Sequence, residues 1–179
     1  MLSFPRKRES SKHRTRCVYR SEDEYWIARS SRAMTKHMLR PNHLFVYGTL
    51  RSESLHPLAR RLQAQAKLVG KASVAGVLYD LGRYPGAAFP KDGRERVIGE
   101  MFALRNAERL LMQLDAYEGV GDPGALLFKR IEIKVRLDRG DVADAWTYAL
   151  QEVPSRARPI PSGDWIAHLR SRNPRAARR

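Results

Sequence analysis

Short apolar stretches of strand-like character dominate the chain from residue 43 onward. Leu44, Phe45, Val46 and Tyr47 form a β-branched and aromatic run that ends at Gly48, which predicts a buried strand followed by a turn. Further strands are predicted over residues 68–81 (broken near the glycines at 70 and 76), 87–89, 97–104, 128–137 and 142–150. In residues 128–137 apolar side chains alternate with charged ones, which is typical of an antiparallel strand with one face exposed.

Three other segments carry apolar residues at helical spacing. The first is expected to begin after Ser54, the second is capped by Asn106 and stopped by Gly119, and the third follows residues 162–164. Their expected buried positions are Leu55, Leu58, Leu62 and Ala66, then Ala107, Leu110, Leu111, Leu114 and Tyr117, and finally Trp165, Ile166 and Leu169. Because strands outnumber helices, the sequence predicts an α+β fold, a small mixed β-barrel or curved sheet with two to three helices.

Charge is concentrated at the two ends of the chain. Its 179 residues suffice for about one domain, and their formal net charge is +15. Residues 1–42 hold 11 basic and 4 acidic residues, and residues 156–179 hold 7 basic and 1 acidic residue. The stretch between them is nearly balanced, with 16 basic and 14 acidic residues. Such ends permit non-specific, salt-sensitive contact with nucleic acid. They lack interleaved aromatic residues and a recognition helix, so nucleic acid is not expected as the main partner.

The same distribution predicts three regions. Residues 1–42 are expected to be a basic, disordered extension, because they show no sustained period and too few apolar residues to offset the entropy of ordering. We expect translation to begin at Met34 or Met38, which would leave the residues upstream of it outside the natural protein. The alternative is a transit peptide, but such peptides are poor in acidic residues, and residues 22–24 are acidic. Residues 43–170 are expected to form the domain, and residues 171–179 an Arg-rich tail.

Several classes of chemistry lack support in the sequence. The single cysteine, Cys17, excludes an intramolecular disulfide framework and a Cys-based zinc cluster. The five histidines show no metal-ligand spacing, and no phosphate-binding or nucleophile-elbow motif is present. We therefore expect neither a metal nor a cofactor. Without an apolar run of about 20 residues or a secretory signal, we expect no membrane contact and a cytoplasmic location. The sequence indicates no oligomeric state.

Two segments are candidates for catalytic chemistry. In the turn after the first strand, the consecutive amides of Gly48, Thr49 and Leu50 could bind a carboxylate or a developing oxyanion, although an ordinary tight turn has the same pattern. Glu118 ends an apolar helix, where the helix dipole and any desolvation raise the pKa of a carboxyl toward that of a general base. The alternative is a solvated Glu before a capping glycine. Asp115, three residues earlier, is expected to face solvent; the alternative is a partner carboxylate of Glu118.

A third segment, residues 78–86, contains Tyr84, which must be extended because Pro85 follows it. This aromatic loop either walls a pocket or only covers the core.

Taken together, these segments resemble the gamma-glutamylcyclotransferase-like family, in its AIG2-like branch. The resemblance extends over about residues 43–170 and rests on six motifs in order: residues 46–51 (Val-Tyr-Gly-Thr-Leu-Arg), 76–86, 99–102 (Gly-Glu-Met-Phe), 114–119 (Leu-Asp-Ala-Tyr-Glu-Gly), 145–148 and 160–165. Residues 52–57 depart from the Gly/Asn-containing stretch of many relatives, which leaves the pocket entrance and leaving-group preference open.

The resemblance implies a small mixed barrel with a pocket at one end. It also implies that the α-amino group of a γ-glutamyl amine or γ-glutamyl amino acid attacks its own γ-amide carbonyl, which releases 5-oxoproline and the free amine. Glu118 would be the general acid and base. The substrate-binding residues would be Tyr47, Gly48, Thr49, Leu50, Arg51, Tyr84 and Tyr148, with Arg51 a candidate partner of the α-carboxylate. The alternative is a non-catalytic module that binds small molecules on the same scaffold.

Overall fold

The computed structural model describes residues 41–120 and 127–172 of the chain. Its strands are β1 (His43–Val46), β2 (Ala66–Ala75), β3 (Val77–Asp80), β4 (Pro85–Ala88), β5 (Arg96–Leu104), β6 (Phe128–Leu137), β7 (Val142–Leu150) and β8 (Arg158–Pro159). Its helices are α1 (Pro57–Gln65), α2 (Ala107–Glu118) and α3 (Trp165–Arg172). The α+β fold predicted from the sequence is confirmed.

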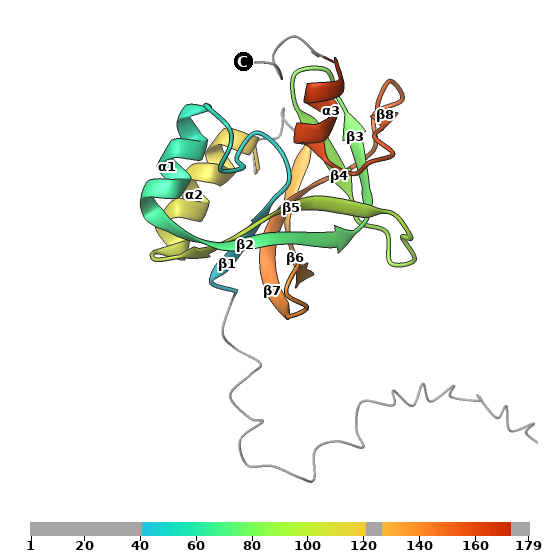
Figure 1. Cartoon of the computed structure of the whole chain (residues 1–179). Coiled ribbons are helices and arrows are strands. Elements are labelled where there is room, and N and C mark those ends of the chain that lie inside the picture. The colour runs from blue at the N-terminus through green and yellow to red at the C-terminus, as the bar shows by residue number, and fades with distance from the viewer. Residues whose placement is uncertain (1–40, 121–126, 173–179) are drawn as a thin grey trace, which may run out of the picture. The chain divides into compact units, whose positions relative to one another are not determined.

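Five strands close into a barrel in the order β1-β5-β2-β6-β7 (Figure 1). Neighbouring strands are antiparallel except at the closure, where β1 runs parallel to β7 and Leu44 lies opposite Trp146. Gly99 of β5 allows β1 to approach closely, because a Cβ there would collide with the backbone oxygen of Val46. The first strand therefore lies in the centre of the molecule and delivers the turn after it to one end of the barrel.

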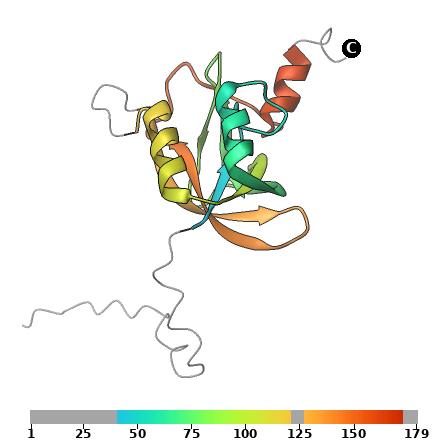
Figure 2. The same cartoon turned by 90° about the vertical axis from the view of Figure 1, so that its left-hand side faces the viewer.

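A second sheet and three helices surround the barrel. The sheet has the order β4-β3-β8, and α1 and α2 lie side by side over one side of the barrel (Figure 2). Asn106 caps α2 by accepting a hydrogen bond from the Arg109 amide at 3.2 Å. Gly119 ends the helix in the left-handed conformation (φ 69°), which glycine adopts without strain. Both helix-end predictions are confirmed.

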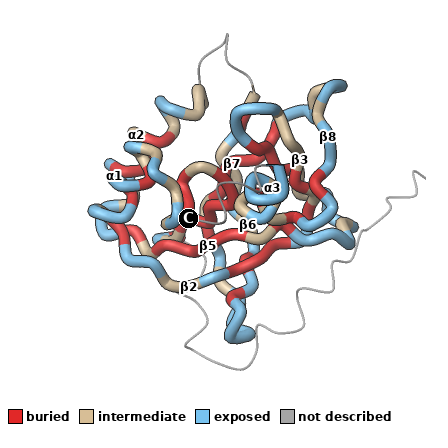
Figure 3. Tube along the Cα trace, turned by 45° about the horizontal axis from the view of Figure 1, so that its top comes forward, coloured by how far each residue is buried: buried red, intermediate tan, exposed pale blue. Residues whose placement is uncertain are grey.

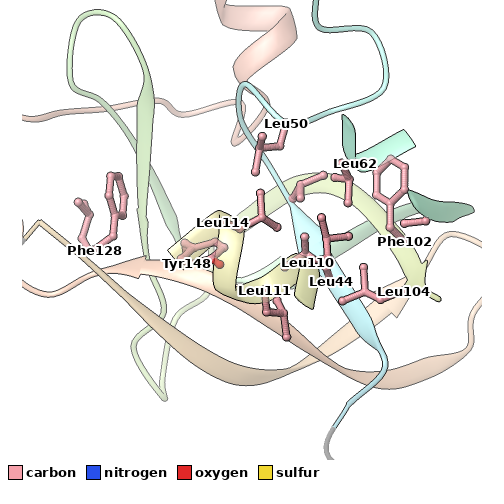
Figure 4. Packing of buried hydrophobic residues seen from close by; sticks show 13 residues of the cluster. Leu44, Leu50, Leu62, Phe102, Leu104, Leu110, Leu111, Leu114, Phe128 and Tyr148 are labelled. Carbon is pink, nitrogen blue, oxygen red and sulfur yellow. The ribbon is translucent and has the colours of Figure 1, made fainter. Parts of the chain in front are cut away.

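Buried residues follow the barrel strands, while the outer sides of α1 and α2 are exposed (Figure 3). One cluster joins these two helices to the barrel through Leu62, Leu110 and Leu114 (Figure 4). A second cluster packs around Trp165 of α3, which is 1% exposed. The barrel core is thus covered by helices on two sides, and this packing holds the C-terminal end of α2 against the barrel.

Several details of the sequence prediction for the helices are wrong. The cap of α1 is His56 rather than Ser54: Pro57 starts the helix, and the His56 Nδ1 accepts a hydrogen bond from the Leu58 amide at 3.3 Å. Proline is favoured in the first helical turn because it lacks an amide hydrogen that would need a partner. Consequently Leu55 precedes the helix and is 81% exposed. Leu169 of α3 is also exposed, because only the first turn of that short helix packs against the barrel. Tyr117 of α2 is 49% exposed rather than buried, and Ala66 begins β2 rather than extending α1.

Candidate active site

A cavity of about 410 Å³ lies between the barrel and the C-terminal end of α2. Its lining comes from segments far apart in sequence: the end of β1 with the following turn, the start of β4, the end of α2, the start of β6, and β7. The lining residues are Phe45, Val46, Tyr47, Gly48, Thr49, Leu50, Tyr84, Pro85, Tyr117, Glu118, Gly119, Leu127, Phe128 and Tyr148. Its size falls within the roughly 300–1,000 Å³ of small-molecule sites.

The turn after β1 forms one wall of this cavity. The Arg51 amide donates to the Gly48 carbonyl at 3.1 Å and so closes the turn. No acceptor among the described residues takes a hydrogen bond from the Thr49 or Leu50 amide. Gly48 is required by close packing, since a Cβ there would lie 2.7 Å from the Pro85 ring. Backbone donors therefore line the cavity next to the strand that β5 and β7 hold in place.

Glu118, at the last position of α2, lines the same cavity as this turn. Within residues 41–120 and 127–172, no group donates a hydrogen bond to its carboxylate and no cation pairs with it. Burial raises its pKa from 4.5 to about 7, because desolvation penalises the charged form. The structure thus combines Glu118 and the 47–50 turn in one cavity, and the carboxyl titrates near neutral pH.

Two tyrosines from opposite sides of the barrel closure also line the cavity. The Tyr47 hydroxyl donates to the Tyr148 carbonyl at 2.7 Å and accepts from the Ala87 amide at 3.2 Å. Burial raises the pKa of Tyr47 far above its ordinary value, and the Glu118 charge adds to the effect. Burial and a hydrogen bond to Asp115 likewise raise the pKa of Tyr148. Both phenols therefore stay neutral across the physiological range and act only as hydrogen-bonding groups.

Tyr84 lines the edge of the cavity on the side of the second sheet. Its ring lies 6.2 Å from that of Phe128, in tilted geometry, and its side chain remains partly exposed. Tyr84 is thus a partly exposed residue at the edge of the cavity.

The structure does not bring Arg51 to the cavity. Its side chain is buried and directed away from the cavity, with Nη1 2.8 Å from the Asp164 carboxylate and Nε 3.5 Å from that of Glu100. Glu100 also accepts hydrogen bonds from the Ser52 amide at 2.7 Å and the Ser52 hydroxyl at 3.0 Å. These ion pairs hold the turn against β5 and α3, so the side chain of Arg51 supports the site from behind.

The solvent-facing position expected for Asp115 is wrong. Its carboxylate accepts hydrogen bonds from the Tyr148 hydroxyl at 2.8 Å and from Arg130 at 2.6 Å. Arg130 in turn stacks over the Trp146 ring, with its guanidinium carbon 5.0 Å from the ring centroid. This cluster ties α2 to β6 and β7. Sequence reasoning missed it because the three partners come from separate elements, and no local spacing links Asp115 to residues 130 and 148.

In the part of the chain that the structure describes, no group of three or more His, Cys, Asp or Glu residues lies close enough to hold a metal ion. No helix there is long and apolar enough to span a membrane.

The model of the family described as gamma-glutamyl cyclotransferase, AIG2-like, matches residues 44–167. The chain belongs to this family. The match extends from β1 to α3, so it includes every segment that lines the cavity. No curated protein matches the chain.

Solved structures of the gamma-glutamyl cyclotransferase fold agree with the observed architecture. YkqA from Bacillus subtilis has a TM-score of 0.58 at 24% identity over 75% of this chain, which spans only 43% of YkqA. PH0828 from Pyrococcus horikoshii has a TM-score of 0.55 at 20% identity, over 75% of this chain and 98% of that one. An AIG2-like protein from Mus musculus has a TM-score of 0.52 at 20% identity, over 64% of this chain and 80% of that one. At these identities the similarity shows the fold alone.

Proposed function

We propose that this protein is an enzyme that cyclises a γ-glutamyl amine or γ-glutamyl amino acid to 5-oxoproline and releases the amine. The family supplies the reaction class, and one observation supports it in this chain. Glu118, with its pKa raised to about 7, lines the same cavity as the Gly48–Leu50 amides. A base that titrates near neutral pH and donors for an oxyanion are the two requirements of amide cleavage at neutral pH.

In the proposed mechanism the substrate supplies both nucleophile and electrophile. Ionised Glu118 takes a proton from the α-ammonium group, and the free amine attacks the γ-carbonyl carbon, so that a carbon–nitrogen bond forms in a five-membered ring. Because both reacting groups belong to one substrate molecule that the enzyme holds in a folded conformation, the reaction avoids the entropy loss of a bimolecular encounter. The carbonyl electrons move to the oxygen, which the Thr49 and Leu50 amides would stabilise.

Collapse of this intermediate breaks the original amide bond. Glu118 removes a second proton from the attacking nitrogen, which keeps one hydrogen in the lactam. Glu118 passes the two protons, one at a time, to the leaving nitrogen, which departs as an ammonium ion. A single carboxyl thus serves as base and acid, a role that requires a pKa near the working pH. The neutral hydroxyls of Tyr47 and Tyr148 help to shape the pocket.

The decisive test is substitution of Glu118→Gln in the full chain, assayed for 5-oxoproline release from γ-glutamyl-alanine. Gln keeps the size of the side chain but accepts no proton, so we expect a loss of at least about 100-fold in kcat. Glu108→Gln is the matched control, because Glu108 lies exposed in the first turn of the same helix, and should keep full activity.

Full activity of the Glu118→Gln variant would contradict the mechanism. Saturable binding of γ-glutamyl compounds without turnover by the unmodified protein would instead favour a non-catalytic binding module.

A further inference from the structure

A second cavity of about 480 Å³ lies beside the candidate active site. Tyr84 and Leu127 line both cavities, so the two spaces adjoin at these side chains. The lining of the second cavity includes residues of β3, β8 and the end of α3, three elements that Figure 1 shows close together. The second cavity therefore borders the first cavity at Tyr84, on the side of the second sheet.

Positive charge dominates the second cavity. Its charged lining residues are Asp80, Arg156, Arg158 and Arg172. Asp80 accepts from Arg172 at 2.8 Å and pairs with His168 at 2.9 Å. Burial opposes its ionisation, but these partners and the Gly82 amide together lower the pKa of Asp80, so its charge is already compensated.

Arg156 and Arg158 form no ion pair with any residue in the described ranges. Two exposed arginines that line this cavity therefore have guanidinium groups without an ion-pair partner among the described residues.

The first cavity has the opposite character. Glu118 is the one charged side chain among the described residues that line it. The α-carboxylate of the substrate is the first carboxylate that must be accommodated there. A second carboxylate would find no cation in the first cavity and two in its neighbour.

The chemistry of ring closure decides which part of the substrate reaches the second cavity. The α-nitrogen must contact both Glu118 and the γ-carbon, so the α-carbon and its carboxylate stay beside the forming ring. The substituent on the leaving nitrogen is not part of the ring and extends away from it. It is therefore the part of a γ-glutamyl compound that is free to pass Tyr84.

We infer that Arg156 and Arg158 form a subsite for a carboxylate on the leaving amine, so that γ-glutamyl amino acids and peptides are preferred over neutral γ-glutamyl amines. This inference rests on the proposed function for the orientation of the substrate. Guanidinium groups suit this task because their paired donors match the two oxygens of a carboxylate.

The test compares γ-glutamyl-alanine with γ-glutamyl-ethylamine, which differ only in the carboxylate on the leaving amine. In the full chain we expect kcat/KM to favour γ-glutamyl-alanine by about tenfold, the amount expected for two solvent-exposed charge pairs, mainly through KM. In the R156Q/R158Q variant this preference should disappear, while kcat/KM for γ-glutamyl-ethylamine stays within about twofold. Added salt should weaken the preference of the unmodified protein.

The matched control is R136Q/R139Q, which removes the same charge at the β6–β7 hairpin, away from β8 (Figure 1). It should retain the preference. Equal kcat/KM for the two substrates, or an unchanged preference in R156Q/R158Q, would overturn the subsite while leaving the cyclisation in place. An equal loss for both substrates in R156Q/R158Q would also overturn it, by assigning the arginines to the α-carboxylate.

A binding measurement separates the subsite from the proposed function. Calorimetry on the E118Q variant should give tighter binding of γ-glutamyl-alanine than of γ-glutamyl-ethylamine, and the difference should vanish in E118Q/R156Q/R158Q. Absence of 5-oxoproline from the unmodified protein would reject the cyclisation, whereas this difference in binding would still support the subsite. Equal affinities, or no binding of either compound, would reject the subsite.

Discussion

At the scale of single residues, Glu118 illustrates how a site is made from an unfavourable placement. The end of a helix carries partial negative charge, and burial removes water from the carboxylate, so ionisation is penalised. No described residue compensates for this with a hydrogen bond. An exposed Glu at the same position would remain ionised at neutral pH and be a poor proton donor.

The pH dependence of activity should report this carboxyl. Ionised Glu118 is needed to accept the first proton, so kcat/KM should rise with pH and level off above about 7. Below that value it should fall about tenfold per pH unit. The measurement is a pH profile of 5-oxoproline release, with Glu108→Gln as the control that keeps the profile. A rise in kcat/KM centred near pH 4.5 instead of 7 would show that Glu118 behaves as a solvated carboxyl.

The same placement should lower the stability of the fold above acidic pH. The pKa of Glu118 is raised in the folded state relative to the unfolded value, so the folded state binds the proton more tightly. The loss of folding free energy caused by ionising the buried Glu118 is absent below about pH 4.5, grows between pH 4.5 and 7, and is complete above pH 7. Glu118→Gln should therefore raise the free energy of unfolding at pH 8 by roughly 2 kcal/mol.

Urea unfolding at two pH values tests this expectation. The gain from Glu118→Gln should shrink below about 0.5 kcal/mol at pH 4.5. Glu108→Gln should instead lose a few tenths of a kcal/mol at pH 8, because an acidic residue in the first helical turn is favourable. Equal stabilities of Glu118→Gln and the unmodified chain at pH 8 would argue against a desolvated carboxylate.

At the scale of elements, the turn after β1 depends on a buried charged residue of β5. The Glu100 carboxylate faces Arg51 and accepts two hydrogen bonds from Ser52, and both charged side chains are 4% exposed. Arg51 is also paired with Asp164, just before α3. One ion-pair cluster therefore links β5, the turn and α3, and the backbone amides of the candidate site depend on it.

Removal of Glu100 should cost much more than removal of an exposed acid. Glu100→Ala leaves Arg51 only partly paired in a buried position, so we expect a loss of about 3 kcal/mol in the free energy of unfolding. Asp144→Ala is the matched control, because Asp144 pairs with Lys134 at the surface, and should cost less than about 1 kcal/mol. Urea denaturation at pH 7 measures both. Similar losses in the two variants would contradict the buried role of Glu100.

At the scale of the whole molecule, the family match and every element of the barrel lie between residues 43 and 172. We propose that residues 43–170 form the catalytic domain and that residues 1–42 and 171–179 are appendages. The net positive charge of residues 1–42 would then serve neither cyclisation nor folding, whereas Arg172 at the end of α3 pairs with Asp80.

Deleting residues 1–37 tests this division, because the shortened chain begins at Met38, before β1. We expect kcat/KM for γ-glutamyl-alanine to remain within about twofold and the urea midpoint to stay unchanged, since mutations outside a folded core have small effects. Retention of the full chain on DNA or RNA at low salt should decrease after the deletion. A large loss of activity would assign residues 1–37 to the enzyme itself.

The sequence alone determined the alternating strand at 128–137, its hairpin partner at 142–150, and the second helix. Residues 128–137 and 142–150 form strands at the predicted positions, and Asn106 and Gly119 bound α2. These signals are local, because alternation and helix caps depend on neighbouring residues. The motifs at 46–51 and 114–119 likewise identified the two segments that meet in the cavity.

Only the tertiary structure decided which side chains serve the cavity and which support it. Arg51 turned away toward Glu100 and Asp164, and Asp115 became the partner of Tyr148 and Arg130. Barrel closure and helix packing bring these groups together over separations of 15 to 113 residues. A local pattern carries no information about such distant partners, and the burial that raises the pKa of Glu118 exists only once the barrel and α2 have packed.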